Sequence, residues 1–126
     1  MRRVVVWLIV LLCFSGCSSA PTYGVEQHGY RVTVTVDEAV LGFRSGEITV
    51  ESTSGQRIET AEVTLTALMR QHGMLLPPQR LQIINGTYRY EQLEINMEGE
   101  WQYQLRINET GTTTLVEVPI VFAPMP

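Results

Sequence analysis

The sequence predicts an all-β fold, a seven-stranded antiparallel immunoglobulin-like β-sandwich that follows a lipoprotein signal peptide. Two observations predict the sandwich. Apolar and polar residues alternate with a period of two in short segments rich in Val, Thr, Ile and Tyr, which is typical of strands with one buried face. Turn-forming residues separate these segments every 8–15 residues, and no helical period is present after residue 17.

Seven segments carry this alternation or a hairpin signal. They are residues 30–36, 47–52, 62–68, 80–84, 87–95, 101–107 and 116–122. The apolar half of each alternation should form the core, because successive side chains of a strand point to opposite faces. The clearest members of this predicted core are Val32, Val34, Val36, Ile48, Val50, Val63, Leu65, Ala67, Trp101, Tyr103, Leu105, Ile107, Val116, Val118, Ile120 and Phe122.

Two local signals refine the later strands. Asn85-Gly86 predicts a tight hairpin, because both turn residues tolerate positive φ. Tyr88 and Tyr90 lie in one alternation register whereas Leu93 and Ile95 lie in the other, so we expect a β-bulge near residues 91–92 that restores the phase. Pro119 lacks a backbone N–H, which predicts that the last strand lies at a sheet edge or carries a bulge.

Residues 1–16 are expected to be a lipoprotein signal peptide. Arg2 and Arg3 form a positive start, and the apolar run 4–14 is too short to span a bilayer but suits a secretory signal. Residues 14–17, Phe-Ser-Gly-Cys, resemble the lipobox that ends bacterial lipoprotein signals. Cys17 would then be the lipidated N-terminus. An ordinary cleaved signal or an uncleaved anchor are the alternatives.

Residues 17–29 lack periodicity and are expected to be a lipidated tether, followed by one domain over residues 30–123. Ser18 stands where Asp would favour the inner membrane in enterobacterial lipoproteins, so this resemblance favours the outer membrane, with the domain facing the periplasm. Loss of Arg2 and Arg3 changes the formal charge from −4 to −6, and the chain contains no Lys. Such an acidic domain is a poor partner for nucleic acid.

One segment gathers candidate metal ligands. Met69, His72 and Met74 offer two thioethers and one imidazole within six residues, a set that suits the soft ion Cu(I). In a seven-strand up-and-down order, Met97 lies in a connection at the same end. The tether would enter at the opposite end, with His28. We therefore expect Met69, His72, Met74 and Met97 to cluster at the membrane-distal end, without His28.

Two other interpretations stay open. Met also fills irregular gaps at the ends of cores, so these residues are equally compatible with packing. The domain is then a non-metal interaction module or an accessory subunit of an envelope complex. We expect no enzymatic activity, because two His, one Asp and no free Cys in the mature chain leave few nucleophile–base pairs.

Four short motifs resemble the YtkA-like family, which comprises bacterial exported immunoglobulin-like domains that are also similar to the extracytoplasmic part of FixH. They are the segments 61–63 (Ala-Glu-Val), 69–74 (Met-x-x-His-Gly-Met), 86–88 (Gly-Thr-Tyr) and 97–101 (Met-Glu-Gly-Glu-Trp). Arg70 stands where family members usually have Pro. FixH-like proteins are associated with copper delivery to oxidases. The resemblance therefore implies copper as the cofactor and an envelope protein as the copper recipient.

Overall fold

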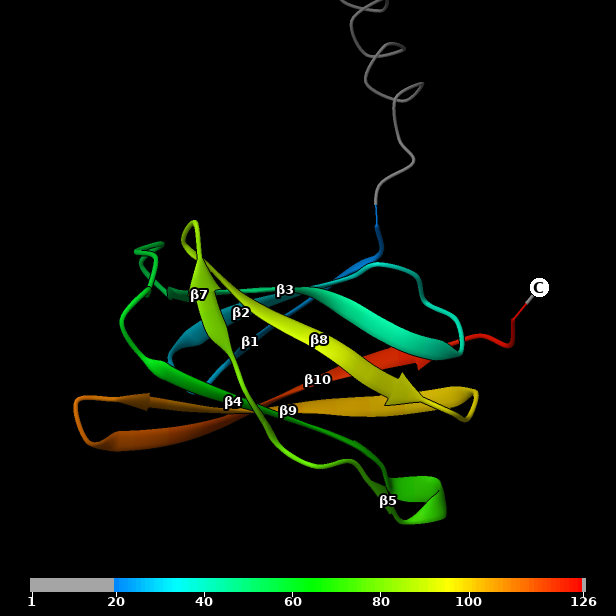
Figure 1. Ribbon diagram of the computed structural model, residues 1–126. Coiled ribbons are helices and arrows are strands. Elements are labelled where there is room, and N and C mark those ends of the chain that lie inside the picture. Colours follow the sequence, from blue (N-terminus) through cyan, green and yellow to red (C-terminus); the bar gives the residue numbers. More distant parts are fainter. Residues whose placement is uncertain (1–19, 126) are drawn as a thin grey trace, which may run out of the picture.

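Two antiparallel sheets pack face to face in the computed structural model, which describes residues 20–125 (Figure 1). One sheet has the strand order β1-β2-β3-β8-β7, and the other has the order β10-β9-β4-β5, with β6 also paired to β4. The strands are β1 (Thr22–Gln27), β2 (Tyr30–Val36), β3 (Gly42–Ser52), β4 (Glu62–Met69), β5 (Met74–Leu75), β6 (Gln79–Arg80), β7 (Gln82–Ile84), β8 (Thr87–Ile95), β9 (Gly99–Glu109) and β10 (Thr112–Phe122). A 3₁₀ turn, η1 (Arg70–His72), follows β4.

The predicted all-β sandwich is confirmed, but the structure has ten strands rather than seven. β1 is an additional strand at the start of the domain. The chain between β4 and β8 contains three short strands where one was expected. Pro77 and Pro78 separate β5 from β6, which both pair with β4, and β7 pairs with β8 in the other sheet. β3 also begins at Gly42, five residues earlier than expected.

The expectation of a tether over residues 17–29 is wrong for its second half. Thr22–Gln27 pair with β2 along their whole length, from Thr22 opposite Thr35 to Gln27 opposite Tyr30. Tyr23 and Val25 pack against the core. The predicted signal peptide and Cys17 lie outside the described residues. Within residues 20–125, no helix is long and apolar enough to cross a membrane.

All sixteen of the predicted core residues named above are buried. The core also takes in Met69, Tyr88, Tyr90, Leu93 and Ile95. Tyr90 and Tyr103, from opposite sheets, meet edge to face with ring centroids 5.5 Å apart and an interplanar angle of 88°. This is a favoured arrangement for two aromatic rings.

The predicted bulge is present in β8. Arg44 lies opposite Leu93 but Gly46 lies opposite Tyr90, so β8 has one more residue than β3 in this interval. Gln92 adopts φ 57° there, and the extra residue brings the two registers into one buried face.

The predicted hairpin and edge position are also confirmed. Asn85 and Gly86 adopt φ 52° and φ 81° between β7 and β8, as the hairpin signal predicts. Pro119 lies in β10, which is an edge strand of its sheet.

Two glutamine side chains join the sheets at their open sides. Gln27 of β1 donates its amide N–H to the Glu117 carbonyl of β10 and accepts from the Glu117 N–H, both at 3.1 Å. Gln79 of β6 makes the same pair of bonds to Glu91 of β8, at 2.8 and 2.9 Å. Each side-chain amide thus satisfies one backbone N–H and one backbone C=O that no strand reaches. Such bonds contribute about 1 kcal/mol each.

Gly46 is required by close packing. A Cβ placed on Gly46 would overlap the Thr35 carbonyl and would lie 2.6 Å from the Tyr90 hydroxyl oxygen. Gly24 of β1 is a suitable comparison, because a Cβ placed there would meet no atom closer than 3.7 Å. Neither glycine has a positive φ, so the two positions differ in space rather than in backbone conformation.

We therefore expect Gly46→Ala to lower the free energy of unfolding by about 3 kcal/mol, because the Thr35 backbone and the Tyr90 ring would have to move. Gly24→Ala should change it by less than about 0.5 kcal/mol. Urea denaturation of both variants, followed by circular dichroism, tests this. Equal stabilities for the two variants would contradict the assignment of Gly46 as a packing position.

Candidate functional site

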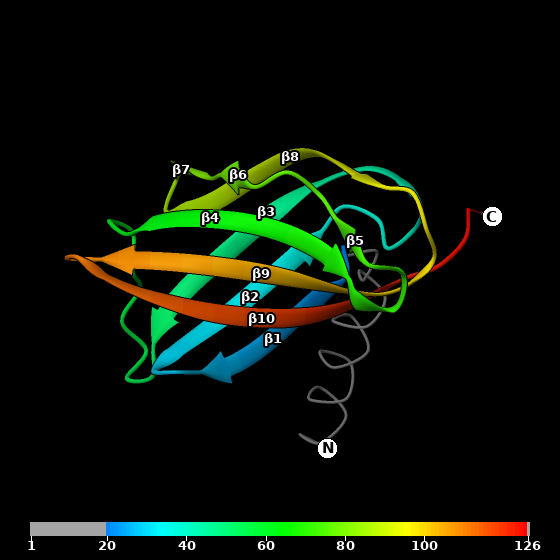
Figure 2. The ribbon, with the colours of Figure 1, turned by 90° about the horizontal axis from the view of Figure 1, so that it is seen from below.

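The methionine end of the sandwich is formed by residues 37–41, 69–76 and 95–98 together with the chain after β10. Hydrogen bonds between the sheets define this end. The Ala123 N–H donates to the Ala39 carbonyl at 2.9 Å, and the Leu41 N–H donates to the Ala123 carbonyl at 3.2 Å. The opposite end, the hairpin end, contains residues 28–29, 53–60 and 110–111. Figure 2 shows the two ends at the right and left of the sandwich.

Met69 and Met74 lie side by side at the methionine end. Met69 is the last residue of β4 and is directly opposite Met74 of β5, so both side chains are on the same face of the sheet. Met69 is fully buried, and Met74 is half-buried against the core. The Met69 Cε would lie 2.8 Å from a Cβ on Gly99, which places this side chain against the turn before β9.

Met97 belongs to that turn and is also half-buried against the core. Its backbone carbonyl accepts a hydrogen bond of 2.9 Å from the Trp101 indole N–H. Trp101 is fully buried, so this bond anchors the turn to the core. The fold therefore brings Met69, Met74 and Met97 to one end, as the sequence predicts.

His72 lies at the same end but differs in exposure. It is the last residue of η1, and no residue of η1 is buried. Gly73 follows with φ 61°, a left-handed conformation that turns the chain into β5. The imidazole is therefore on the outside of the loop, whereas the Met69 thioether is inside the core.

Arg70 ties the loop after β4 to β10, the edge strand of the same sheet. Its guanidinium donates to the Glu117 carboxylate of β10 at 2.6 Å, and the same oxygen accepts from the Gln104 amide at 3.1 Å. The hydrogen bond from Arg70 is the largest cause that lowers the pKa of Glu117, and burial of this carboxyl opposes it. The residue that stands in place of the family's usual Pro thus has a structural partner.

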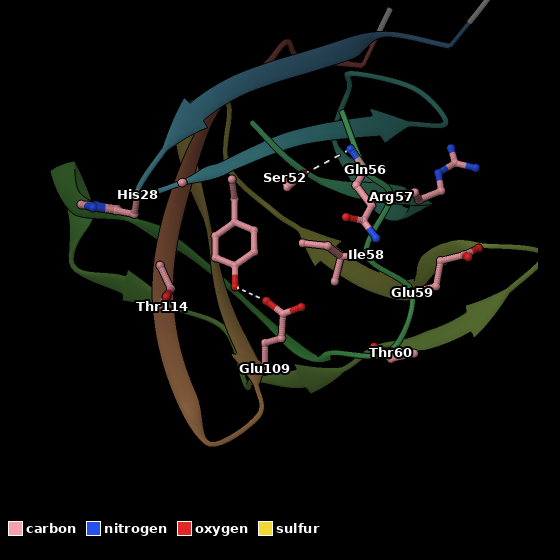
Figure 3. A pocket seen from close by; sticks show the side chains of 11 residues that line it. His28, Ser52, Gln56, Arg57, Ile58, Glu59, Thr60, Glu109 and Thr114 are labelled. Carbon is pink, nitrogen blue, oxygen red and sulfur yellow. Dashed lines mark hydrogen bonds between the residues drawn. The ribbon is translucent and has the colours of Figure 1, made fainter. Parts of the chain in front are cut away.

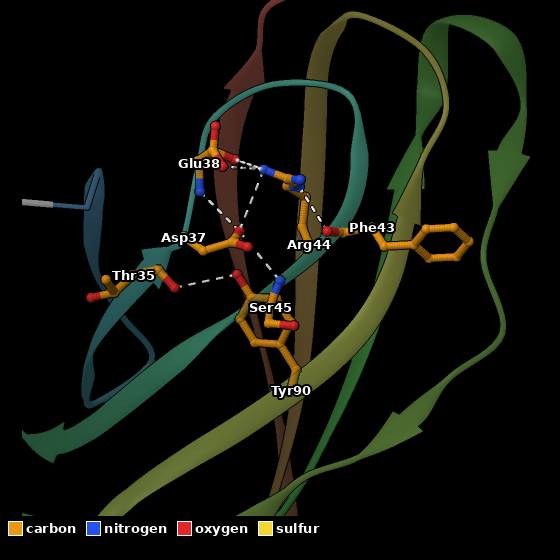
Figure 4. A network of polar contacts seen from close by, with 7 residues as sticks. All are labelled: Thr35, Asp37, Glu38, Phe43, Arg44, Ser45 and Tyr90. Atoms are coloured by element: carbon orange, nitrogen blue, oxygen red, sulfur yellow. Dashed lines mark hydrogen bonds and ion pairs between the residues drawn. The ribbon is translucent and has the colours of Figure 1, made fainter. Parts of the chain in front are cut away.

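A second polar group at this end was not predicted from the sequence (Figure 4). The Arg44 side chain is only 11% exposed and lies 3.7 Å from the Asp37 carboxylate and 3.8 Å from that of Glu38. Asp37 also accepts the N–H groups of Glu38 and Ser45. These contacts hold the 37–41 loop, while the Phe43 ring points away from the network.

His28 is at the hairpin end and does not join the methionines, as expected. It borders a polar groove of about 550 Å³ with Tyr30, Arg57, Glu59 and Glu109 (Figure 3). Tyr30 donates its hydroxyl to the Glu109 carboxylate at 2.8 Å, and burial together with this carboxylate raises the pKa of Tyr30. The His28 ring points away from that pair.

The expected orientation of the site is wrong. From the sequence, the candidate ligands are expected opposite the point where the N-terminal segment enters. The added strand β1 reverses this, because it crosses the sandwich once before β2. Thr22 lies opposite Thr35, and the Val36 N–H donates to the Pro21 carbonyl at 3.0 Å, so the chain enters at the methionine end.

The methionine end fits the chemistry of a soft metal ion in its donor set. Four thioethers, those of Met69, Met74, Met97 and Met125, and the imidazole of His72 are present there, and Cu(I) prefers such ligands. Met74, Met97 and His72 are at least partly exposed, whereas Met69 lies beneath them in the core. Within residues 20–125, no three His, Cys, Asp or Glu side chains form a group that could hold a metal ion.

Fold and site together define a small antiparallel β-sandwich domain with a methionine-rich loop at one end. The family model described as YtkA-like matches residues 24–106, and the chain belongs to this family. The match begins within β1, in agreement with the structural start of the domain. Family membership supports an envelope-associated domain. Comparison with curated proteins and with solved structures gave no match.

The Arg70–Glu117 pair should make stability depend on pH. The pKa of Glu117 is lower in the folded chain than its ordinary value of 4.5, so the pair stabilises the fold above that pH. This contribution is lost as the pH falls through the folded-state pKa. We expect the stability difference between the wild type and Glu117→Gln in urea denaturation to shrink as the pH falls below about 6 and through the folded-state pKa of Glu117. The stability difference between the wild type and Arg70→Gln should shrink in the same way. A stability difference that grows on acidification would contradict the assignment of this pair.

Proposed function

We propose that this chain is a lipid-anchored protein of the bacterial cell envelope that binds Cu(I) at its methionine end and buffers or delivers it. The observation that carries the proposal is that Met69 pairs with Met74 across the sheet and reaches the Gly99 turn, which also carries Met97. A bound Cu(I) ion would supply a soft cation for transfer to an envelope protein. Thioether and imidazole groups can hold this ion without a thiol.

The exposure of the four side chains divides their roles. Met74 and Met97 are half-buried thioethers, and His72 lies outside on η1. Met69 packs against the Gly99 turn and fixes the inner wall of the site. The Arg70–Glu117 contact holds the loop that carries His72.

We expect purified protein to bind Cu(I) with low-micromolar or tighter affinity. Combined substitution of His72→Ala and Met74→Leu should weaken binding at least about tenfold, because two of the proposed ligands are removed. Competition with a Cu(I)-specific chelator measures the affinity. His28→Ala is the control, since His28 is at the hairpin end. Affinity unchanged in the double variant would remove the copper proposal.

The proposed anchor rests on the sequence of residues 1–17. A positive start, an apolar run and a small-residue segment before Cys17 are typical of bacterial lipoproteins, and Ser18 favours the outer membrane over the inner. Two acyl chains on one residue give a stable membrane anchor.

Cys17→Ser should therefore move the protein from the membrane fraction to the soluble periplasmic fraction, or leave an unprocessed precursor. Mass spectrometry of the wild-type N-terminal peptide should show acyl groups on Cys17. Ser18→Ala is a matched control that keeps the acceptor. An unmodified Cys17 in the mature protein would remove the lipid anchor.

A second candidate function is an interaction module without metal. Phe43 is 60% exposed and borders an apolar groove with Leu76, Pro77 and Pro78 at the methionine end. Exposed apolar surface of this kind can mark a protein contact. Protein that binds no Cu(I) in the chelator competition would favour this candidate.

A further inference from the structure

The N-terminal segment joins the domain at the methionine end. Pro21 accepts a hydrogen bond from Val36, and β1 starts one residue later, opposite Thr35. Only Ser18 and Ser19 separate Cys17 from Ala20, where the described chain begins, which makes three steps along the chain. A fully extended chain spans at most about 3.6 Å per residue, so Cys17 lies within about 11 Å of Ala20. A lipid on Cys17 would hold this end, rather than the hairpin end, next to the bilayer.

Exposed apolar side chains gather at the same end. Within residues 20–125, seven large apolar residues are exposed, and four of them belong to the methionine end or to the strand ends that lead into it. They are Phe43, Leu75, Val121 and Met125, with exposed fractions of 60%, 69%, 60% and 68%. The groove between Phe43 and residues 76–78 has a volume of about 550 Å³, enough for one or two apolar side chains.

Among the described residues, the methionine end carries more carboxylates than arginines, and some of these carboxylates form no ion pair. Arg44 is paired with Asp37 and Glu38, Arg70 is paired with Glu117, and Arg80, which lines the groove, is paired with Glu62. Within the described part of the chain, Glu94, Glu98 and Glu100 are exposed and form no ion pair. Glu94 lines the groove, Glu98 follows Met97, and Glu100 borders a shallow pocket with Arg70. Exposed carboxylates that form no ion pair are repelled by anionic lipid headgroups and attracted to a basic surface.

We infer that the methionine end is a docking surface for a basic segment of another protein held in the same membrane. This inference rests on the proposed lipid anchor at Cys17 and is independent of copper. Arg or Lys side chains of the partner pair with Glu94, Glu98 and Glu100. An apolar side chain of the partner enters the groove beside Phe43.

The segment between Cys17 and the domain is short, which favours a partner held in the same membrane. A lipid would hold Cys17 at the bilayer, and the chain enters the domain at the methionine end, so this end lies nearer to the bilayer than the hairpin end does. A protein in the same membrane therefore meets it more readily than a soluble protein does. The uncompensated carboxylates select a basic segment rather than the bare bilayer, since exposed carboxylates are poorly accommodated at an anionic surface. The apolar groove gives such a segment an anchor besides charge.

The test uses the full lipidated protein in phosphatidylcholine vesicles. A fluorescent label is attached through Gln71→Cys at the methionine end or through Thr112→Cys at the hairpin end. Both positions are exposed, and neither lies in the groove. Energy transfer to a headgroup dye reports orientation. Energy transfer to a labelled transmembrane Leu–Ala helix reports docking, with a flank of Arg and Leu in one peptide and of Gln and Leu in its matched control.

We expect the label at residue 71 to be closer to the headgroups than the label at residue 112, and the Arg-flanked peptide to bind. Replacement of Glu94, Glu98 and Glu100 by Gln should weaken this binding about tenfold, and added salt should weaken it too. Replacement of Glu51, Glu59 and Glu91 by Gln removes the same charge elsewhere and should leave binding unchanged.

Each other outcome overturns one part of the inference. A closer label at residue 112 overturns the orientation. Equal binding of the Arg- and Gln-flanked peptides overturns the choice of a basic partner. Insertion of the residue 71 label into peptide-free vesicles makes the bilayer itself the occupant. Failure of the protein to attach to vesicles removes the lipid anchor and the inference with it, whereas the other failures leave the anchor and the copper proposal intact.

Discussion

The whole structure depends on burying the inner faces of two sheets that share no strand. The aromatic residues Trp101, Tyr103 and Tyr90 and the aliphatic residues around them are shielded only while both open sides of the sandwich are closed. Gln27 and Gln79 close one side each, because their amides pair with the backbone of the opposite sheet. The positions of the loops at both ends depend on this closure, because the loops connect the strands that it holds together. Met69, for example, reaches the Gly99 turn only because β4 and β9 are in register.

Much of the fold could be predicted because its signals are local. The change of register between Tyr90 and Leu93 predicts the bulge, and Asn85-Gly86 predicts its hairpin, since both depend on neighbouring residues alone. β1 gave a weaker signal. It has only two apolar inward residues, Tyr23 and Val25, with Gly24 between them. Its turn, His28-Gly29, has positive φ at both residues, but His at the first position is not the usual sign of a hairpin.

The candidate site was predicted in composition but not in orientation. Two connections that carry Met lie at one end because an even number of strand crossings separates them, and the sequence is sufficient to predict this. The direction relative to the N-terminus depends on the total number of crossings before β4, so a single missed strand reverses it. The Arg44–Asp37 contact could not be predicted either, since its partners meet only after β2 and β3 have paired.

Pro119 affects whether neighbouring copies of the chain can pair through their edge strands. β10 is an edge strand, and a long edge with free N–H groups is a template for pairing with a neighbouring copy. Pro119 removes one donor from this edge, and the Gln27 amide occupies the groups of Glu117 two residues away. Proteins confined to the plane of a membrane meet at far higher local concentrations than proteins in solution. For a domain anchored as we propose, a blocked edge would keep crowded copies apart and prevent their sheets from merging into aggregates.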